Sequence, residues 1–213
     1  MEFYDVINAR HMVREWKSED ISMEALKRIL AAGLKAPTHD HRRNWEFIIL
    51  HGQQEKETAL QFAKAWSVSQ EEQKEVSALG SIPQRMYAYA MPRQYSMLVT
   101  APYVVIPLFK GAGIWGARAV NGLNSFASIW CVVENILLAA TAEGLACSMR
   151  IPVGEEGKQV MSVLDVPEGY VMPCYIGIGY PAENAHVVAQ VEKPVDSALH
   201  FGKWQEVFED GVL

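Results

Sequence analysis

The residues best suited to chemistry stand near the amino terminus and in one polar link further along the chain. Arg10 and Arg14 are four positions apart, so a helix continuing through them would place both guanidiniums on one side. The link runs from Ala36 to Phe47 and contains imidazole, guanidinium, hydroxyl and indole groups. A plain connector would favour Gly, Asn or Ser. The residue types therefore predict a site for a planar, polar ligand.

The charge of the whole chain narrows the class of ligand. The formal net charge is -6 and the pI is about 5.5, so a nucleic-acid partner has no electrostatic support. Basic residues are nevertheless dense at Arg10/Arg14 and at Arg42/Arg43. Such clustering in an acidic chain indicates a small anion, such as one phosphate. For the first pair, a solvated basic turn is an alternative that stays open at this point.

The histidines of the link, His39 and His41, allow three interpretations. They contact a bound ligand, they are solvated loop residues, or they bind a metal ion. Two imidazoles with no third ligand at a recognisable spacing make a poor metal site, so no metal is expected. The three cysteines form no CxxC pair, and the amino-terminal residues do not read as a signal peptide. The sequence thus predicts a protein of the reducing cytoplasm.

Regular elements are expected on both sides of these residues. With 213 residues, 50% of them hydrophobic, the chain can form one large domain over 1–213. Ser22 is expected to cap a helix that runs to about Lys35, and Pro37 to end it. Pro107 indicates that its strand lies at an edge or carries a bulge. Further helices are expected over 2–10, 53–66, 125–144 and 155–164, and buried strands over 47–50, 101–109 and 170–180.

The helix expected over 125–144 is apolar nearly all round, which requires burial in the centre of the fold or at a subunit interface. Glu134 and Asn135 at its middle would be costly in lipid, so no membrane span is expected. Residues 67–93 are a candidate lid or excursion. The mixed tail 182–213 is expected to embrace a second subunit.

Residues 111–116 match G-x-G-x-x-G literally. The dinucleotide fingerprint needs a following helix and then a second parallel strand that ends in an acidic residue. Asn121-Gly122 interrupts the helix after a few residues, and Glu134 falls inside the next helix. A flexible loop is therefore expected here, and no Rossmann unit.

Several short motifs in one order give the chain a recognisable likeness. They are Arg-x-x-x-Arg at 10–14, Ala-Pro-Thr before Asn-Trp-x-Phe at 44–47, the Ala-Pro strand at 101–102, Glu-Asn-Ile-Leu-Leu-Ala-Ala at 134–140, Gly-Leu at 144–145, and Gly-x-Gly-Tyr-Pro at 177–181. Together they span nearly the whole chain and resemble the FMN-dependent nitroreductase family.

The resemblance implies an α+β fold, a three-layer sandwich with a mainly antiparallel central sheet flanked by helices, in an intertwined homodimer. It implies one FMN at each of two interface sites and NAD(P)H as electron donor. Hydride would pass through flavin N5 in ping-pong turnover to a nitroaromatic, quinone or similar small planar acceptor. The same scaffold allows a specialised reaction, such as reductive dehalogenation or dehydrogenation, or a flavin-binding dimer without turnover. No catalytic side chain is expected, because the flavin carries the hydride.

The family pattern also assigns the cations of the site. It implies that Arg10, His11, Met12 and Arg14 hold the flavin phosphate and the pyrimidine edge, with Arg14 near N1. Lys193 would help with the phosphate. Met12 stands where the family has a Ser, and Glu192 lies where a second cation is usual, so one phosphate partner is missing.

The remaining assignments concern the flavin ring. The pattern implies that Pro37, Thr38 and His39 lie against it from the partner subunit, with His41 where the family often has an Asn. It further implies a segment over the isoalloxazine ring that offers a backbone N–H toward N5. That segment consists of Ser148, Met149, Arg150 and Ile151.

Overall fold

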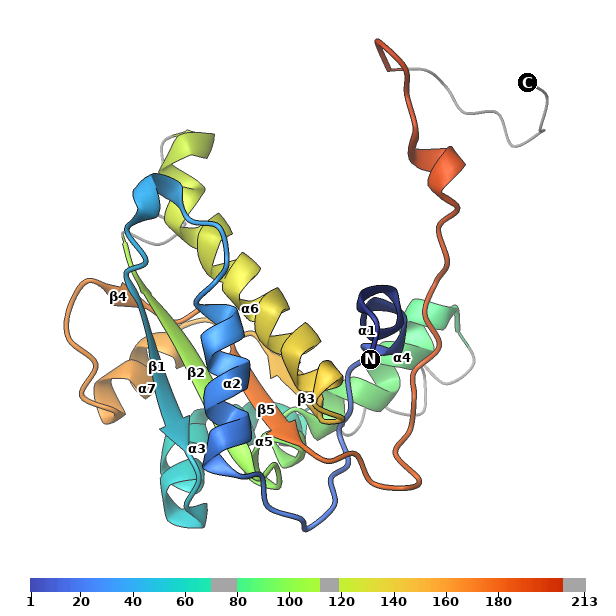
Figure 1. Ribbon diagram of the computed structural model, residues 1–213. Helices are drawn as coiled ribbons and strands as arrows, with labels where there is room; N and C mark the ends of the chain where they lie inside the picture. Colours follow the sequence, from blue (N-terminus) through green and yellow to red (C-terminus); the bar gives the residue numbers. More distant parts are fainter. Residues whose placement is uncertain (70–79, 112–118, 205–213) are drawn as a thin grey trace.

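The computed structural model of the chain describes residues 1–69, 80–111 and 119–204. Its centre is an antiparallel sheet in which neighbouring strands follow the order β1-β2-β5-β3, while β4 pairs with β2 beside this path (Figure 1). The strands are β1 (Trp45–Leu50), β2 (Tyr103–Lys110), β3 (Ala146–Arg150), β4 (Tyr170–Val171) and β5 (Tyr175–Gly179).

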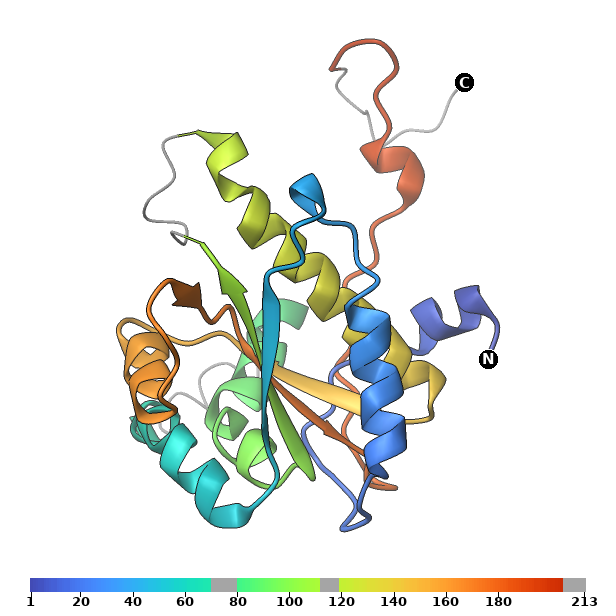
Figure 2. The same cartoon turned by 60° about the vertical axis from the view of Figure 1, so that its left-hand side comes forward.

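Helices cover both faces of the sheet, as Figure 1 and Figure 2 show from two directions. Alternate residues of a strand point to opposite faces, and β2 uses both. Its residues 103, 105 and 109 enter a core with α2 and α6, whereas 104, 106 and 108 enter a second core with α3, α5 and α7. This confirms the three-layer α+β sandwich.

The helical elements take the following bounds. They are α1 (Phe3–Ala9), α2 (Met23–Gly33), α3 (Gln53–Ser69), α4 (Ile82–Ala90), α5 (Ser96–Val99), α6 (Asn124–Ala142) and α7 (Glu156–Val163), with 3-10 turns η1 (His39–His41), η3 (Met91–Arg93), η4 (Val120–Leu123) and η5 (Val195–Ala198).

The observed strands differ from the predicted ones at two prolines and at β3. Of the two alternatives that Pro107 indicated, an edge strand or a bulge, the edge strand is wrong, because β1 and β5 flank β2 on its two sides. Proline is tolerated there because β5 pairs with residues 103–105 and β4 with 109–110, so Pro107 falls between the two paired stretches. The strand predicted over 170–180 is interrupted around Pro173, giving β4 and β5. The segment that forms β3 was not predicted as a strand.

α2 begins where the sequence predicts. The Ser22 hydroxyl accepts a hydrogen bond from the Ala25 N–H at 3.2 Å, which satisfies one of the donors left unpaired at the start of a helix. The helix ends at Gly33, slightly before the expected Lys35. A Cβ at Gly33 would lie 2.9 Å from Ile136 of α6, so the glycine lets the two helices approach closely.

α6 is the long apolar helix that the sequence predicts, and one side of it packs in the core with α2 and the sheet. It is long and apolar enough to cross a membrane by length and composition alone. The expectation that it is buried on every side does not hold within one chain. Trp130, Cys131 and Leu138 are half-buried and Glu134 is exposed, so the outer side of α6 is only partly covered.

The tail after β5 leaves the body of the molecule and extends past α1 and α4 (Figure 1). Its apolar side chains are largely in solvent: Phe201 is 74% exposed and Trp204 82% exposed. α4, by contrast, packs on the body, with Ala90 buried. Residues 70–79 of the candidate lid, residues 112–116 of the G-x-G-x-x-G run and the end of the tail, 205–213, lie outside the described residues.

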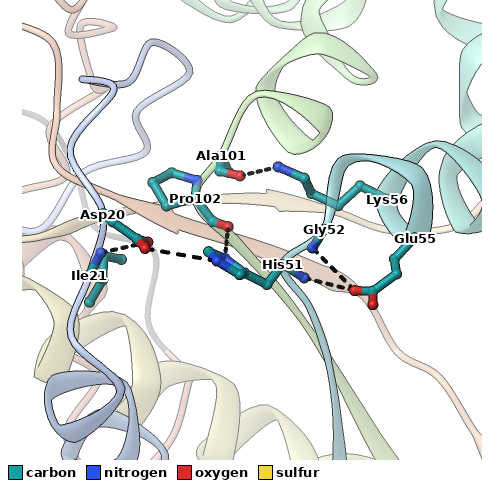
Figure 3. A network of polar contacts seen from close by, with 8 residues as sticks. All are labelled: Asp20, Ile21, His51, Gly52, Glu55, Lys56, Ala101 and Pro102. Carbon is teal, nitrogen blue, oxygen red and sulfur yellow. Dashed lines mark hydrogen bonds and ion pairs between the residues drawn. The ribbon is translucent and has the colours of Figure 1, made fainter.

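A polar network fixes the end of β1 that lies away from the polar link (Figure 3). The Nδ1 atom of His51 lies 3.1 Å from the Pro102 carbonyl, and its ring stacks on Tyr103 with centroids 4.4 Å apart. The buried Lys56 Nζ donates to the Ala101 carbonyl at 2.8 Å, and burial lowers the pKa of this amine. These contacts tie the start of α3 to the start of β2.

Candidate functional site

The amino-terminal cations lie along the edge strand β3. α1 ends at Ala9, close to the predicted end at Arg10, and Arg10 has an extended backbone (φ -65°, ψ 119°). The helix does not continue to Arg14, so the two arginines are not placed on one side of a helix. Met12 instead forms a parallel bridge with Cys147, and the Val13 N–H donates to the Cys147 carbonyl at 2.9 Å. Four residues of extended chain span about 13 Å, compared with about 6 Å between helical i,i+4 neighbours. The two arginines can therefore contact separate parts of one ligand.

Neither arginine is neutralised by the part of the chain that the structure describes. Arg10 and Arg14 are both half-buried, and neither forms an ion pair with a described residue. The Arg14 Nε atom is buried and has no hydrogen-bond partner there. Desolvation lowers the pKa of Arg14, although Tyr89 and Glu15 partly offset the effect. A buried cation with an unused donor is a position where an anionic or polar ligand would be stabilised.

His11 and Met12, two of the three residues between the arginines, contact the local backbone and the core. The His11 ring nitrogen Nδ1 lies 2.7 Å from the Ala9 carbonyl, which fixes the ring close to its own chain. Met12 is half-buried against the core cluster around α6. The segment is thus held by main-chain contacts while the arginine side chains remain available.

The structure divides the predicted residues of β3 between the core and the surface. Ser148 is fully buried, with its hydroxyl donating to the Met97 carbonyl at 3.5 Å. Arg150 is 2% exposed and forms a bidentate ion pair with Glu156. Met149 is half-buried and Ile151 is 56% exposed. The side chains of Ser148 and Arg150 therefore stabilise the fold. The surface of this segment is formed by Met149, Ile151 and the backbone.

The polar link forms a second, separate surface. It contains η1, and three of its residues adopt positive φ: Asp40 (55°), His41 (52°) and Arg43 (44°). Pro37 and the ring of His39 are exposed, while Thr38 is half-buried. The carboxylate of Asp40 lies 3.2 Å from His39 Nε2 and 3.6 Å from Arg42 Nη2.

The link is fastened to the first turns of α6, where the His39 N–H donates to the Ser128 hydroxyl at 3.4 Å. A pocket of about 50 Å³ opens between the link, the end of β2 and the start of α6. Lys110 and Arg42 are among its lining residues. Within the described ranges, no group of three or more His, Cys, Asp or Glu side chains gathers as a metal site would require.

Within one chain the two predicted halves of the site do not meet. The link packs on the amino-terminal turns of α6, whereas 10–14 runs along β3, which follows the other end of that helix (Figure 1). Lys193 is exposed on the extended tail. A site that uses both halves requires a second copy of the chain.

A group of residues beside Arg14 was missed by sequence reasoning. The carboxylate of Glu15 is held by Tyr89 and Arg93, and the ring of His186 lies 4.4 Å from that of Tyr89. The i,i+4 spacing of Tyr89 and Arg93 in the sequence weakly indicated that these two side chains lie on one side of a helix. No sequence pattern indicated that both contact Glu15.

The antiparallel sheet with helices on both faces defines the class, an α+β sandwich, and the segment with Arg10 and Arg14 lies beside its strand β3. A family model described as "Nitroreductase family" matches residues 7–180. The chain belongs to the nitroreductase family.

Similar proteins include an iodotyrosine deiodinase of Nematostella vectensis, which is 23% identical over 210 residues, covering 93% of this chain and 74% of that protein. An NADPH-dependent oxidoreductase of Staphylococcus aureus (strain MRSA252) is 22% identical over 203 residues, covering 94% of this chain and 73% of that protein. The crystal structure of oxidized iodotyrosine deiodinase bound to FMN and 3-iodo-L-tyrosine has a TM-score of 0.68 at 18% identity, covering 95% of this chain and all of that one.

Proposed function

We propose that the chain binds FMN and uses it to pass electrons from NAD(P)H to a small conjugated acceptor, such as a nitroaromatic or a quinone. The observation that carries this proposal is Arg14, whose buried Nε has no partner among the described residues. An unpaired buried donor on a cation is costly unless a ligand completes it. Arg10 supplies a second guanidinium along the same extended segment.

FMN fits these residues by charge and by spacing. Its phosphate is an anion that suits Arg10, and the polar edge of its pyrimidine suits a second cation further along the chain. Membership of the nitroreductase family and the FMN bound to the deiodinase structure support this cofactor. The name of the Staphylococcus aureus relative supports NADPH as a donor.

We place each site between two copies of the chain. The amino-terminal arginines of one copy would face the link 37–41 of the other, because these segments lie near opposite ends of α6 within one copy. The partly covered outer side of α6 and the exposed apolar tail support such a homodimer, since both would be buried by a partner. Sedimentation should give a dimer, and a stable monomer that retains FMN would contradict the shared site.

Each group of this chain has a simple role in the proposed reaction. Bound FMN supplies the hydride chemistry. Arg10 binds the phosphate, and Arg14 stabilises the negative charge that reduced flavin carries near N1. Met149 and Ile151 offer apolar surface to a flat ring system. No side chain is assigned to proton transfer, which solvent can supply.

The test is the colour of the purified protein and its response to reduced nicotinamides. A yellow protein whose flavin band bleaches anaerobically with NADH or NADPH, and recovers with a nitroaromatic or a quinone, supports the proposal. Arg14→Met should weaken FMN retention strongly, whereas Arg28→Met, which removes an exposed arginine paired with Glu143, should not. A colourless protein that does not take up added FMN would overturn the proposal.

Reductive deiodination is the second candidate, because similar sequences include iodotyrosine deiodinases over 93% of this chain. Reduced protein should then release iodide from 3-iodotyrosine. If iodide release is faster than reduction of the nitroaromatic and the quinone, this candidate replaces the first. If no iodide appears while those acceptors reoxidise the protein, it is excluded.

A further inference from the structure

Three elements meet in a polar cluster beside Arg14: the extended amino-terminal segment, α4 with η3, and the start of the tail. The Tyr89 hydroxyl donates to Glu15 Oε1, and Arg93 Nε lies 3.4 Å from the same oxygen. The Arg93 guanidinium also stacks over the Tyr89 ring, 4.0 Å from its centroid, and donates to the Tyr89 carbonyl at 2.9 Å. Glu15 is therefore held by two groups from one short stretch of chain.

Arg14 and Glu15 are neighbours of opposite charge, yet they do not pair. No nitrogen of Arg14 lies within 4.0 Å of a Glu15 oxygen, although the Arg14 guanidinium is 5.7 Å from the centroid of Tyr89. Both side chains thus reach the same tyrosine. Arg14 Nε and Glu15 Oε2 are each buried and have no hydrogen-bond partner in the described part of the chain. A buried cation and a buried carboxylate on neighbouring residues attract one another, so other contacts are needed to keep them from pairing.

We propose that Tyr89 and Arg93 are positioning residues that hold Glu15 away from Arg14 and thereby keep the Arg14 guanidinium available to FMN. This inference rests on the proposed function. If Glu15 were released, its carboxylate could swing to Arg14, neutralise the cation and repel the negative charge of the cofactor. Arg93 prevents this by offering Glu15 a competing cation, and Tyr89 adds a hydrogen bond that fixes the carboxylate.

The test compares FMN dissociation constants, measured by the quenching of FMN fluorescence on titration with the full-length protein freed of flavin. Arg93→Met should weaken FMN binding about tenfold, as expected when a charge-assisted contact to the cofactor is lost. It should also move the flavin midpoint potential to more negative values, because the charge near N1 is less well stabilised. Adding Glu15→Gln should restore both quantities, because the amide cannot neutralise Arg14. Tyr89→Phe, which removes only the hydroxyl, should act in the same direction as Arg93→Met but more weakly.

The control is a second arginine–glutamate pair. Arg28 and Glu143 form a bidentate contact on the surface at 2.7 and 2.8 Å, and neither Arg28→Met nor its combination with Glu143→Gln should change FMN affinity. If Arg93→Met weakens binding and Glu15→Gln fails to restore it, Arg93 supports the fold in general and the inference is wrong. If the FMN affinity is unchanged in both Arg93→Met and Tyr89→Phe, the inference is also wrong.

Arg14→Met separates this inference from the proposed function. If Arg14→Met leaves FMN affinity unchanged, the proposed site itself fails. If it weakens FMN binding while Arg93→Met does not, only the positioning role fails.

Discussion

Arg150 and Glu156 form a bidentate ion pair inside the protein, with Nη2 2.6 Å from Oε2 and Nε 3.0 Å from Oε1. Their side chains are 1% and 5% exposed. The Tyr175 hydroxyl donates to Glu156 at 2.8 Å, and the Val153 N–H donates to it at 3.2 Å. The pair joins the end of β3 to the first turn of α7, and it fixes the intervening loop beside the candidate site.

Removing one partner of this pair should destabilise the fold strongly. Arg150→Met leaves the Glu156 carboxylate buried without its cation, and breaking a buried pair from one side costs about 3–5 kcal/mol. Adding Glu156→Gln should recover much of this loss, because the amide can still accept the hydrogen bond from Tyr175. Urea unfolding of the single and double variants measures the difference. A double variant that is less stable than Arg150→Met alone would show that the buried charge is not the source of the cost.

Two of the three cysteines should be unreactive in the native protein. Cys147 and Cys174 are buried, and desolvation raises the pKa of the Cys147 thiol to about 12 and raises that of Cys174 as well. Since the thiolate is the reactive form, neither should react at pH 8. A thiol reagent should therefore modify no more than one cysteine per chain, Cys131, until denaturant is added. Rapid modification of Cys147 would mean that the segment 10–14 does not stay on β3.

The sequence predicts those parts of the fold that depend on local pattern. Ser22 capped its helix because a cap needs only one hydroxyl at the right position. α6 followed from a long apolar run bounded by Gly144. The sequence did not predict β3, because Ser148 and Arg150 are polar residues that are not expected in a buried strand. They are buried only because they form tertiary contacts with Met97 and Glu156.

The site was less predictable than the fold, for a physical reason. The spacing of Arg10 and Arg14 indicated a shared ligand, but the geometry behind it is extended chain on β3 and not helix. Which charges remain unneutralised depends on long-range partners. Tyr89 and Arg93 lie more than seventy positions from Glu15, and no local pattern in the sequence indicates that they hold its carboxylate.

Gly177 of β5 should not tolerate a side chain. A Cβ there would lie 2.5 Å from Ser148 Oγ and 3.3 Å from the Met97 carbonyl oxygen, in a place where all three residues are buried. Overpacking of this kind costs about 1–3 kcal/mol, so Gly177→Ala should lower the free energy of unfolding by that amount. Gly157→Ala is the control. Its Cβ meets Pro152 at an ordinary 3.4 Å within α7, and the change should be neutral or stabilising by up to about 1 kcal/mol.

Tyr89 should give the protein a pH dependence at alkaline pH. Desolvation and the hydrogen bond to Glu15 raise the pKa of Tyr89 to about 12 from the ordinary 10. Between these two values the unfolded chain loses the phenolic proton while the folded protein keeps it, so the contribution of Tyr89 to stability is present below pH 10 and declines as the pH rises toward 12. The stability difference between the wild-type protein and Tyr89→Phe, from urea unfolding at pH 9 and at pH 11, should therefore change in favour of the variant at the higher pH.

The phenolate absorbance of the native protein, with that of Tyr89→Phe subtracted, should rise with a midpoint near 12. A midpoint near 10 would mean that the hydroxyl is not held by Glu15, and the arrangement of charges around Arg14 would have to be different.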